Sequence, residues 1–151
     1  MDGLNTTELQ KFFDSAFPPG AARVFTIEDA RPHFARVRMR YAARFLRPGG
    51  TISGPAQMTL VDTAMWMAVG ATMGENAKQA VTSNMNMAFL RRPKQADLIG
   101  EAQILRFGRT LAYGEVKIWS DGDDTPVAHA TCTYALPRAA IAPEATTASP
   151  E

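Results

Sequence analysis

Apolar residues recur at helical spacing in two parts of the chain, with different consequences. Residues 4–16 carry apolar side chains on one face, which predicts a short amphipathic helix capped by Thr6 or Thr7. Residues 55–73 are apolar on every side, which predicts a long buried helix. Ser53-Gly54-Pro55 marks its start, because serine or glycine caps a helix and proline suits the first turn. The run is long enough to cross a bilayer, but its polar residues favour a helix buried in protein. Those residues are Gln57, Thr59, Asp62 and Thr63.

Alternating apolar and polar residues predict six strands around this helix. Two precede it, at 22–28 and 33–41, with a turn at 29–32 between them. The arginines of the second strand are expected to form a solvated face. Four strands follow the helix, at 79–90, 97–107, 110–120 and 126–136. Consecutive strands without helices between them form an antiparallel sheet, so we expect an α+β fold in which the sheet covers the helix. One helix cannot cover both faces of a sheet, so the far face needs water or another subunit.

Length and composition predict one globular domain with two short additions. The chain has 151 residues, of which 46% are hydrophobic and 21% charged, enough apolar material for one core. We assign residues 1–20 to the N-terminal helix and a linker, and 21–137 to the main domain. Residues 138–151 are rich in Ala, Thr and Pro, which predicts a disordered tail.

Charge and cysteine content exclude several classes of protein. A net charge of +1 gives no general attraction for nucleic acid, so no nucleic-acid partner is expected. One cysteine, Cys132, allows no intramolecular disulfide, which suits a reducing cytosol. The N-terminus has no basic start and no apolar signal core, so we expect a cytoplasmic protein without a membrane partner. His33 and His129 are distant from Cys132 in sequence and give no metal-ligand spacing, so no metal is expected.

Asp62 is unusual because it is the only charged residue between Arg47 and Glu75. Burying a carboxylate without a partner is costly, so Asp62 needs either a local partner or a chemical role. The free N–H of Gly54, at the positive end of the helix, is suited to stabilise an oxyanion. Asp62 lies roughly 10–12 Å further along the helix at 1.5 Å per residue, too far to act on a group bound there. It could face the helix start of another subunit, or bond Thr59, Thr63 or a strand of the sheet.

Two asparagines and a set of basic residues are further candidates for ligand binding. Alternation places Thr82, Asn84 and Asn86 on one strand face, where the asparagines could bond a ligand, a water or the sheet edge. Basic residues occur near two strand ends, and together they could hold phosphates or be solvated turn charges. They are Arg91, Arg92 and Lys94 near one end, and Arg106 and Arg109 around the next hairpin.

The segments between about Ala22 and Pro137 resemble the hotdog-fold acyl-CoA thioesterases. The similarity is carried by the loop LRPGG, the helix segment LVDTAM and the strand VTSNMNMAFLRRP, followed by RFGRTLAYGEV and VAHATCTYALP. The most similar group is the phenylacetate-pathway thioesterases and their 4-hydroxybenzoyl-CoA thioesterase relatives. The order and spacing of the segments together indicate the fold.

The resemblance implies a curved antiparallel sheet wrapped around the long helix, in a homodimer that often pairs into a dimer of dimers. The active site of such enzymes lies at the subunit interface and hydrolyses an acyl-CoA to the free acid and CoA. No cofactor is needed, because CoA is part of the substrate. Matched residue by residue, Asp62 falls on the catalytic acid and Gly54 on the glycine whose N–H polarises the thioester carbonyl. Whether Asp62 is a general base or a nucleophile stays open.

The chain departs from the family pattern at two positions. Ser53-Gly54-Pro55 stands where members often have His-Gly-Gly, and Arg47 stands where an asparagine is common. Ser53, Asn84 and Asn86 are weaker candidates to orient the water or the thioester. Arg47, Arg92 and Arg109 complete the candidate substrate-binding residues. The missing histidine supports an alternative, a non-catalytic acyl- or CoA-binding protein. A hydratase of the same fold is disfavoured because neither histidine falls in a suitable motif.

Overall fold

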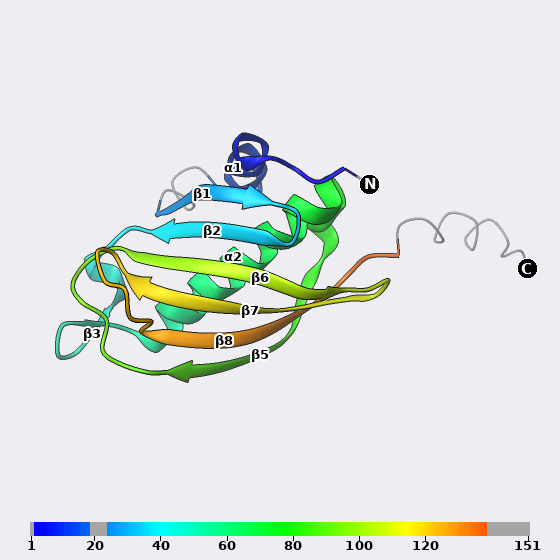
Figure 1. Cartoon of the computed structure of the whole chain (residues 1–151). Helices are drawn as coiled ribbons and strands as arrows, with labels where there is room; N and C mark the ends of the chain where they lie inside the picture. Colours follow the sequence, from blue (N-terminus) through cyan, green and yellow to red (C-terminus); the bar gives the residue numbers. More distant parts are fainter. Residues whose placement is uncertain (1, 19–23, 139–151) are drawn as a thin grey trace, which may run out of the picture.

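A curved six-stranded antiparallel sheet wraps the long helix α2 in the computed structural model, which describes residues 2–18 and 24–138 (Figure 1). The sheet order is β1-β2-β6-β7-β8-β5, and β3 and β4 form a separate small hairpin before α2. The helices are α1 (Thr6–Ser15) and α2 (Gly54–Met73), with short 3-10 turns at Ala43–Phe45 and Gly74–Gln79. The strands are β1 (Phe25–Arg31), β2 (Phe34–Met39), β3 (Leu46–Arg47), β4 (Thr51–Ile52), β5 (Val81–Phe89), β6 (Leu98–Phe107), β7 (Leu111–Ser120) and β8 (Ala128–Ala135). This is the predicted hotdog architecture, in which the sheet encloses one central helix.

Helix α2 is buried by the sheet along most of its length, as its uniformly apolar sequence predicts. Ser53 is the N-cap, since its Oγ accepts the Ala56 N–H at 3.2 Å, and Pro55 occupies the first turn. Close packing against the sheet depends on Gly100 in β6, where an added Cβ would lie 3.0 Å from Leu60. Within the described residues, no helix combines the length and the apolar character needed to span a bilayer.

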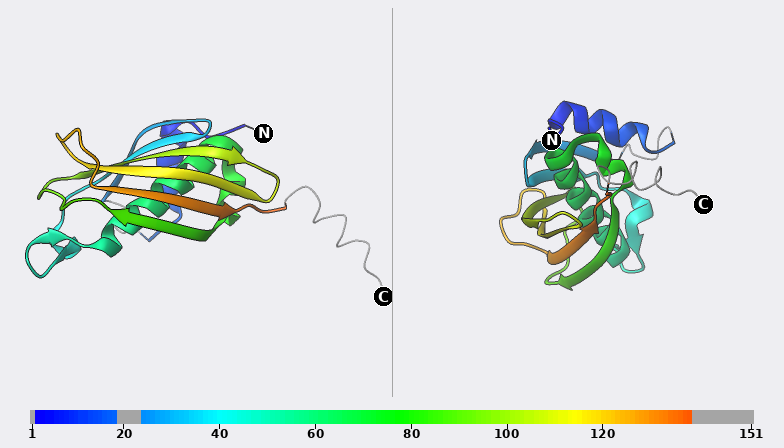
Figure 2. Two further views of the ribbon diagram at one scale, coloured as in Figure 1. Left: turned by 60° about the horizontal axis from the view of Figure 1, so that its bottom comes forward. Right: turned by 90° about the vertical axis from the view of Figure 1, so that its right-hand side faces the viewer.

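Helix α1 packs on the same side of the sheet as α2, above its C-terminal half (Figure 2). Its N-cap is Asn5 rather than the predicted Thr6 or Thr7, because Asn5 and Glu8 form a reciprocal capping box. Its buried face carries Leu9, Phe12 and Phe13. The rings of Phe12 and Trp66 meet edge to face at 5.3 Å, so α1 extends the core beyond the sheet and α2.

The first two strands differ from the sequence prediction at their turn. Strand β1 continues to Arg31, whereas a turn was predicted at 29–32, and a bulge between Ile27 and Asp29 accommodates the longer strand. The predicted start at Ala22 lies outside the described residues. Alternation in β2 is confirmed for its core face. The opposite face is less exposed to solvent than predicted, because Arg36 and Arg38 are half-buried in a network of ion pairs. Their partners are Glu28, Glu101, Asp97 and Asp121.

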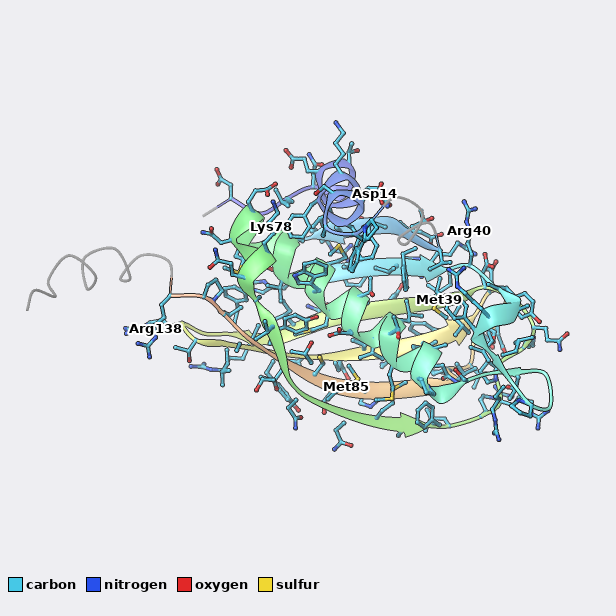
Figure 3. All side chains as sticks on the ribbon, turned by 180° about the vertical axis from the view of Figure 1, so that it is seen from behind. Asp14, Met39, Arg40, Lys78, Met85 and Arg138 are labelled. Carbon is cyan, nitrogen blue, oxygen red and sulfur yellow. The ribbon has the colours of Figure 1, made fainter. Side chains whose placement is uncertain are left out.

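Strand β5 forms one edge of the sheet and pairs only with β8 among the described strands. Seen from the helix side, it runs beside α2, with Met85 near the middle of the strand (Figure 3). Apolar side chains at its two ends are exposed, with Val81 at 60% and Phe89 at 53%. A long edge strand with unpaired backbone groups is a template for pairing with another chain. The fold therefore leaves one edge open beside the helix.

The predicted division into segments is only partly visible. Helix α2 and strands β1 to β8 lie between Val24 and Pro137, and α1 packs onto them. The division of the chain at residues 20 and 137 stays a prediction. The tail predicted to be disordered lies outside the described residues, apart from Arg138. No group of three His, Cys, Asp or Glu side chains in residues 2–18 and 24–138 is placed to hold a metal ion.

Candidate active site

Asp62 is half-buried on α2, and two hydroxyl groups from the sheet hold its carboxylate. Thr82 of β5 donates to Oδ1 at 2.5 Å, and Tyr134 of β8 donates to the same oxygen at 2.6 Å. Asp62 therefore bonds two strands of the sheet, as one of the local partners considered from the sequence, while its role toward another subunit stays a prediction. Thr59 instead donates to the carbonyl of Pro55. Among the described residues, no donor reaches Oδ2 of Asp62, so one carboxylate oxygen is fixed and the other is available for chemistry.

The hydroxyl of Tyr134 is suited to a permanent donor role. The side chain is buried, with 3% of its surface exposed. Burial and the neighbouring Asp62 carboxylate raise the pKa of Tyr134 above its usual range. Tyr134 therefore keeps its proton at any pH near neutrality and orients Asp62 throughout that range.

A pocket of about 500 Å³ opens beside Asp62, and we call it the Asp62 pocket. Its lining combines several aromatic side chains, called here its aromatic wall, with the hydroxyls that hold the carboxylate. Its lining residues are Phe13, Phe17, Phe25, Thr59, Asp62, Thr63, Trp66, Ala80, Val81, Thr82 and Tyr134. An apolar cavity with one oriented carboxylate is typical of a ligand site.

A second pocket, of about 410 Å³, lies at the N-terminus of α2 and is called the Gly54 pocket. Its lining residues are Arg47, Thr51, Ile52, Gly54, Gln57, Phe89, Leu90, Arg91, Arg92 and Pro93. None of the described residues lines both pockets, so one protomer carries the carboxylate and the helix start in separate cavities. This agrees with the spacing of about two helical turns between Gly54 and Asp62.

The two asparagines lie on the other side of the sheet from Asp62. Asn84 pairs with Thr133 and Asn86 with Thr131, and these threonines alternate with the buried residues of β8. The prediction that Thr82 shares a face with the asparagines is wrong, because a bulge shifts the register between Thr82 and Asn84. Thr82 consequently turns toward α2 while Asn84 and Asn86 face outward. A role of the asparagines in substrate binding stays a prediction without support from this arrangement.

The basic residues do not form the single cluster that the sequence suggested. Arg47, Arg91 and Arg92 line the Gly54 pocket, and none forms an ion pair with a described residue. Arg109 follows the far end of β6, in the hairpin to β7 near Met73. Because β5 and β6 run in opposite directions in the sheet, their C-terminal ends, and with them Arg92 and Arg109, lie at opposite ends of the protomer.

Neither histidine lines either pocket, and the cysteine is inert. His129 contacts Glu115 at 3.0 Å on the outer face of the sheet. His33 is in the β1–β2 turn, where its N–H donates to Thr72. Burial, reinforced by the charge of Asp62, raises the pKa of the Cys132 thiol to about 12. Asp62 is therefore the ionisable group best placed for chemistry in the described part of the chain.

Thr82 and Tyr134 were not among the predicted site residues. A buried tyrosine hydroxyl needs a hydrogen-bond partner. The position of Tyr134 on the apolar face of an alternating strand could therefore have indicated a polar contact in the core. Thr82 could not be placed, because its orientation depends on the bulge in β5.

Comparison with known proteins gives a consistent family. The thioesterase superfamily model matches residues 49–127, more than half of the chain. A protein of Halobacterium salinarum described as a candidate esterase is 30% identical over 102 residues, covering 65% of this chain and 67% of that protein. The structure is also similar to a candidate thioesterase from Silicibacter sp. TM1040, with TM-score 0.79 and 34% identity over 89% of this chain and 92% of that one. Zebra fish thioesterase superfamily member 2 has TM-score 0.78 and 26% identity, covering 89% of this chain and all 100% of its own.

Proposed function

We propose, because the chain belongs to the thioesterase superfamily, that it hydrolyses an acyl-CoA to a free acid and CoA at a site formed between two subunits. The family and the relatives support thioester hydrolysis as the reaction class. The single observation that carries the proposal is the Asp62 carboxylate, held through one oxygen by Thr82 and Tyr134 and open at the other.

The open edge at β5 supports an active site shared between subunits. Asp62 contacts the start of β5 through Thr82, whereas Gly54 lies beside the end of β5, where Phe89 is its neighbour. Two-fold symmetric pairing of two β5 edges is antiparallel, so the start of one strand lies beside the end of the other. Such a dimer brings the Asp62 pocket of one protomer against the Gly54 pocket of its partner. It also joins the two groups that are too far apart within one chain.

In the proposed reaction, the thioester carbonyl oxygen accepts a hydrogen bond from Gly54 N–H at the positive end of α2. Water attacks the carbonyl carbon while the free oxygen of Asp62 takes its proton, and the resulting tetrahedral oxyanion remains at Gly54. The carbon–sulfur bond then breaks as the oxyanion collapses, and the departing thiolate takes the proton from Asp62, which restores the carboxylate. Direct attack by Asp62 would instead give an acyl-enzyme anhydride that water then cleaves.

The two pockets suit the two ends of an acyl-CoA. The aromatic wall of the Asp62 pocket, formed by Phe13, Phe17 and Trp66, suits an apolar acyl group. At the Gly54 pocket, Arg91 and Arg92 are exposed and suit the phosphates of CoA. Since Arg109 is at the opposite end of its own protomer, only antiparallel pairing would bring it toward the partner's Arg92.

Hydrolysis is tested by incubating the purified protein with a panel of acyl-CoA esters and following release of the CoA thiol. The proposal expects turnover of at least one ester with an apolar acyl group. A second candidate function is acyl-CoA binding without cleavage. It is favoured by Ser53, whose hydroxyl is occupied by the helix cap where the family often has histidine. Tight binding of esters without thiol release would establish this second function.

Removing the Thr82 hydroxyl is expected to lower turnover without unfolding the protein. Thr82→Val keeps the side-chain shape but loses one of the two donors to Asp62. A hydrogen bond to a charged group contributes ~1.5–3 kcal/mol, so kcat should fall roughly 10- to 100-fold. Thr82→Ser retains the hydroxyl and serves as the matched control, with kcat near that of the wild type. Equal rates for Thr82→Val and Thr82→Ser would show that Thr82 does not orient Asp62.

A charge on the open edge is expected to separate the subunits. Val81→Glu places a carboxylate at an edge position that is 60% exposed in the protomer, so the monomer should fold normally. Burial of that carboxylate in the dimer is unfavourable, so sedimentation at micromolar concentration should shift from dimer or larger to monomer. Leu105→Glu, at a β6 position that is 57% exposed, is the control and should leave the β5–β5 dimer intact. A wild-type protein that sediments as a monomer would contradict the interface site.

A further inference from the structure

The first turn of α2 has few hydrogen-bond donors left for a ligand. Ser53 Oγ accepts the Ala56 N–H, and the Ser53 carbonyl accepts the Gln57 N–H at 3.2 Å. Pro55 has no N–H. Among the described residues, Gly54 therefore carries the only N–H of this turn that is not already bonded. Sites that stabilise the oxyanion of acyl transfer commonly combine two or more donors, so the Gly54 pocket needs a further donor.

Gln57 is a buried polar residue in the same pocket as Gly54. Its side chain is 4% exposed, and its Oε1 is buried without a hydrogen-bond partner among the described residues. Nε2 is then the atom of this amide left to face the pocket, and it donates to no described residue. Buried polar side-chain atoms without partners are rare in folded proteins and lower their stability. An apolar side chain of similar size would fill the space without that penalty. Packing within the protomer therefore does not explain why an amide side chain is present at position 57.

The geometry of the helix directs this amide toward the oxyanion position. Residues three apart share a helix face, so Gln57 lies on the same face as Gly54. The Cα–Cβ bonds of an α-helix tilt toward its N-terminus, which aims the Gln57 side chain back at the first turn. Arg47 also lines the pocket but is exposed on β3, whereas Gln57 is fixed by burial on the helix that carries Gly54.

We propose that the side-chain amide of Gln57 is the second donor of the oxyanion site, bonding the same thioester oxygen as Gly54 N–H. This inference rests on the proposed function for the identity of the ligand. It assigns Gln57 a direct contact with the reacting carbonyl, and so a catalytic role. Gln57 compensates for Pro55, which removes a backbone donor from the first turn.

The test uses the full-length protein and an acyl-CoA analogue in which a methylene group replaces the thioester sulfur. The analogue carries ¹³C at its ketone carbon, and polarisation of the bound carbonyl moves its NMR signal downfield. We expect Gln57→Met to lose about half of the shift seen with the wild type, since one of two donors is removed. It should also lower kcat about 100- to 1,000-fold with KM nearly unchanged. The melting temperature should stay the same or rise, because the unpaired Oε1 is gone.

Gln103→Met is the matched control, because it makes the same substitution at an exposed β6 position that lines neither pocket. This variant should keep both the carbonyl shift and kcat. An unchanged carbonyl shift in Gln57→Met would overturn the proposal. If Arg47→Met loses the shift and Gln57→Met keeps it, the second donor is the Arg47 guanidinium, and the proposal is also overturned. A wild-type protein that fails to bind or polarise the analogue overturns it too. A wild-type protein that polarises the ketone but cleaves no thioester would refute the proposed hydrolysis. The carbonyl shift in Gln57→Met would still decide whether Gln57 is the second donor.

Discussion

We expect Asp62→Asn to lower thioester turnover by about 100-fold or more, the usual effect of losing a general base. Asparagine has nearly the shape of aspartate, and its side-chain oxygen can still accept from Thr82 and Tyr134. What it lacks is a basic oxygen at the position of Oδ2. Turnover is measured as release of the CoA thiol at saturating ester, where an effect on kcat separates from an effect on binding.

The fold of this variant provides the control. Because both sheet hydroxyls keep an acceptor, the melting temperature and the sedimentation of Asp62→Asn should match those of the wild type. Tyr134→Phe gives the complementary case, since it keeps the carboxylate and removes one donor. Asp62→Asn turnover within a few-fold of the wild type would remove Asp62 from the mechanism, whether as base or as nucleophile.

Gly54→Val is expected to reduce turnover by roughly 100- to 1,000-fold, the scale reported for loss of an oxyanion donor. The backbone at Gly54 does not need glycine for its conformation, because its φ is not positive. An added Cβ would lie 3.2 Å from Cζ of Phe89, an exposed ring that can move aside. The protein should therefore fold and assemble, while the branched side chain crowds the carbonyl held at this N–H. Circular dichroism, sedimentation and kcat on one preparation separate these effects.

Ser53→Ala is the control for the helix start. Since Ser53 Oγ caps the helix through the Ala56 N–H, its loss should cost about 1 kcal/mol of stability. Turnover should stay within a few-fold of the wild type. A large loss of turnover without a loss of stability would mean that Ser53 acts on the substrate in place of the family histidine. A stable, dimeric and fully active Gly54→Val would refute the oxyanion assignment.

The sequence predicted the central helix well because several signals there agree. A cap at Ser53 or Gly54, the proline at position 55 and apolar residues on every side all predicted a buried helix over 55–73, and the structure confirms it with one more residue at the start, from Gly54 to Met73. The antiparallel sheet followed from four strands without helices between them. Asp62 was identified because a lone charge in an apolar helix needs a partner.

The details that failed depend on contacts distant in sequence. The bulge between Thr82 and Asn84 turns Thr82 toward Asp62, and alternation alone cannot reveal a residue that is inserted into a ladder. One error did not depend on distant contacts. The Asn5–Glu8 capping box is visible in the sequence, but the helix cap was predicted at Thr6 or Thr7.

The placement of the arginines shows a different limit. Counting strands in an antiparallel sheet would have put Arg92 and Arg109 at opposite ends, but their nearness in sequence suggested one cluster. Gln57 was treated only as evidence against a membrane span. Its burial without a partner for Oε1 becomes visible only when the packing around the helix start is known.

The shared site is tested most directly by mixing the two inactive variants, Asp62→Asn and Gly54→Val. Exchange of subunits gives mixed dimers, in which one site combines the intact Asp62 of one protomer with the intact Gly54 of the other. If half of the dimers are mixed and each has one intact site, activity should recover to about a quarter of the wild-type value. Each variant alone stays inactive. No recovery after demonstrated subunit exchange would contradict a site that takes Asp62 and Gly54 from different subunits.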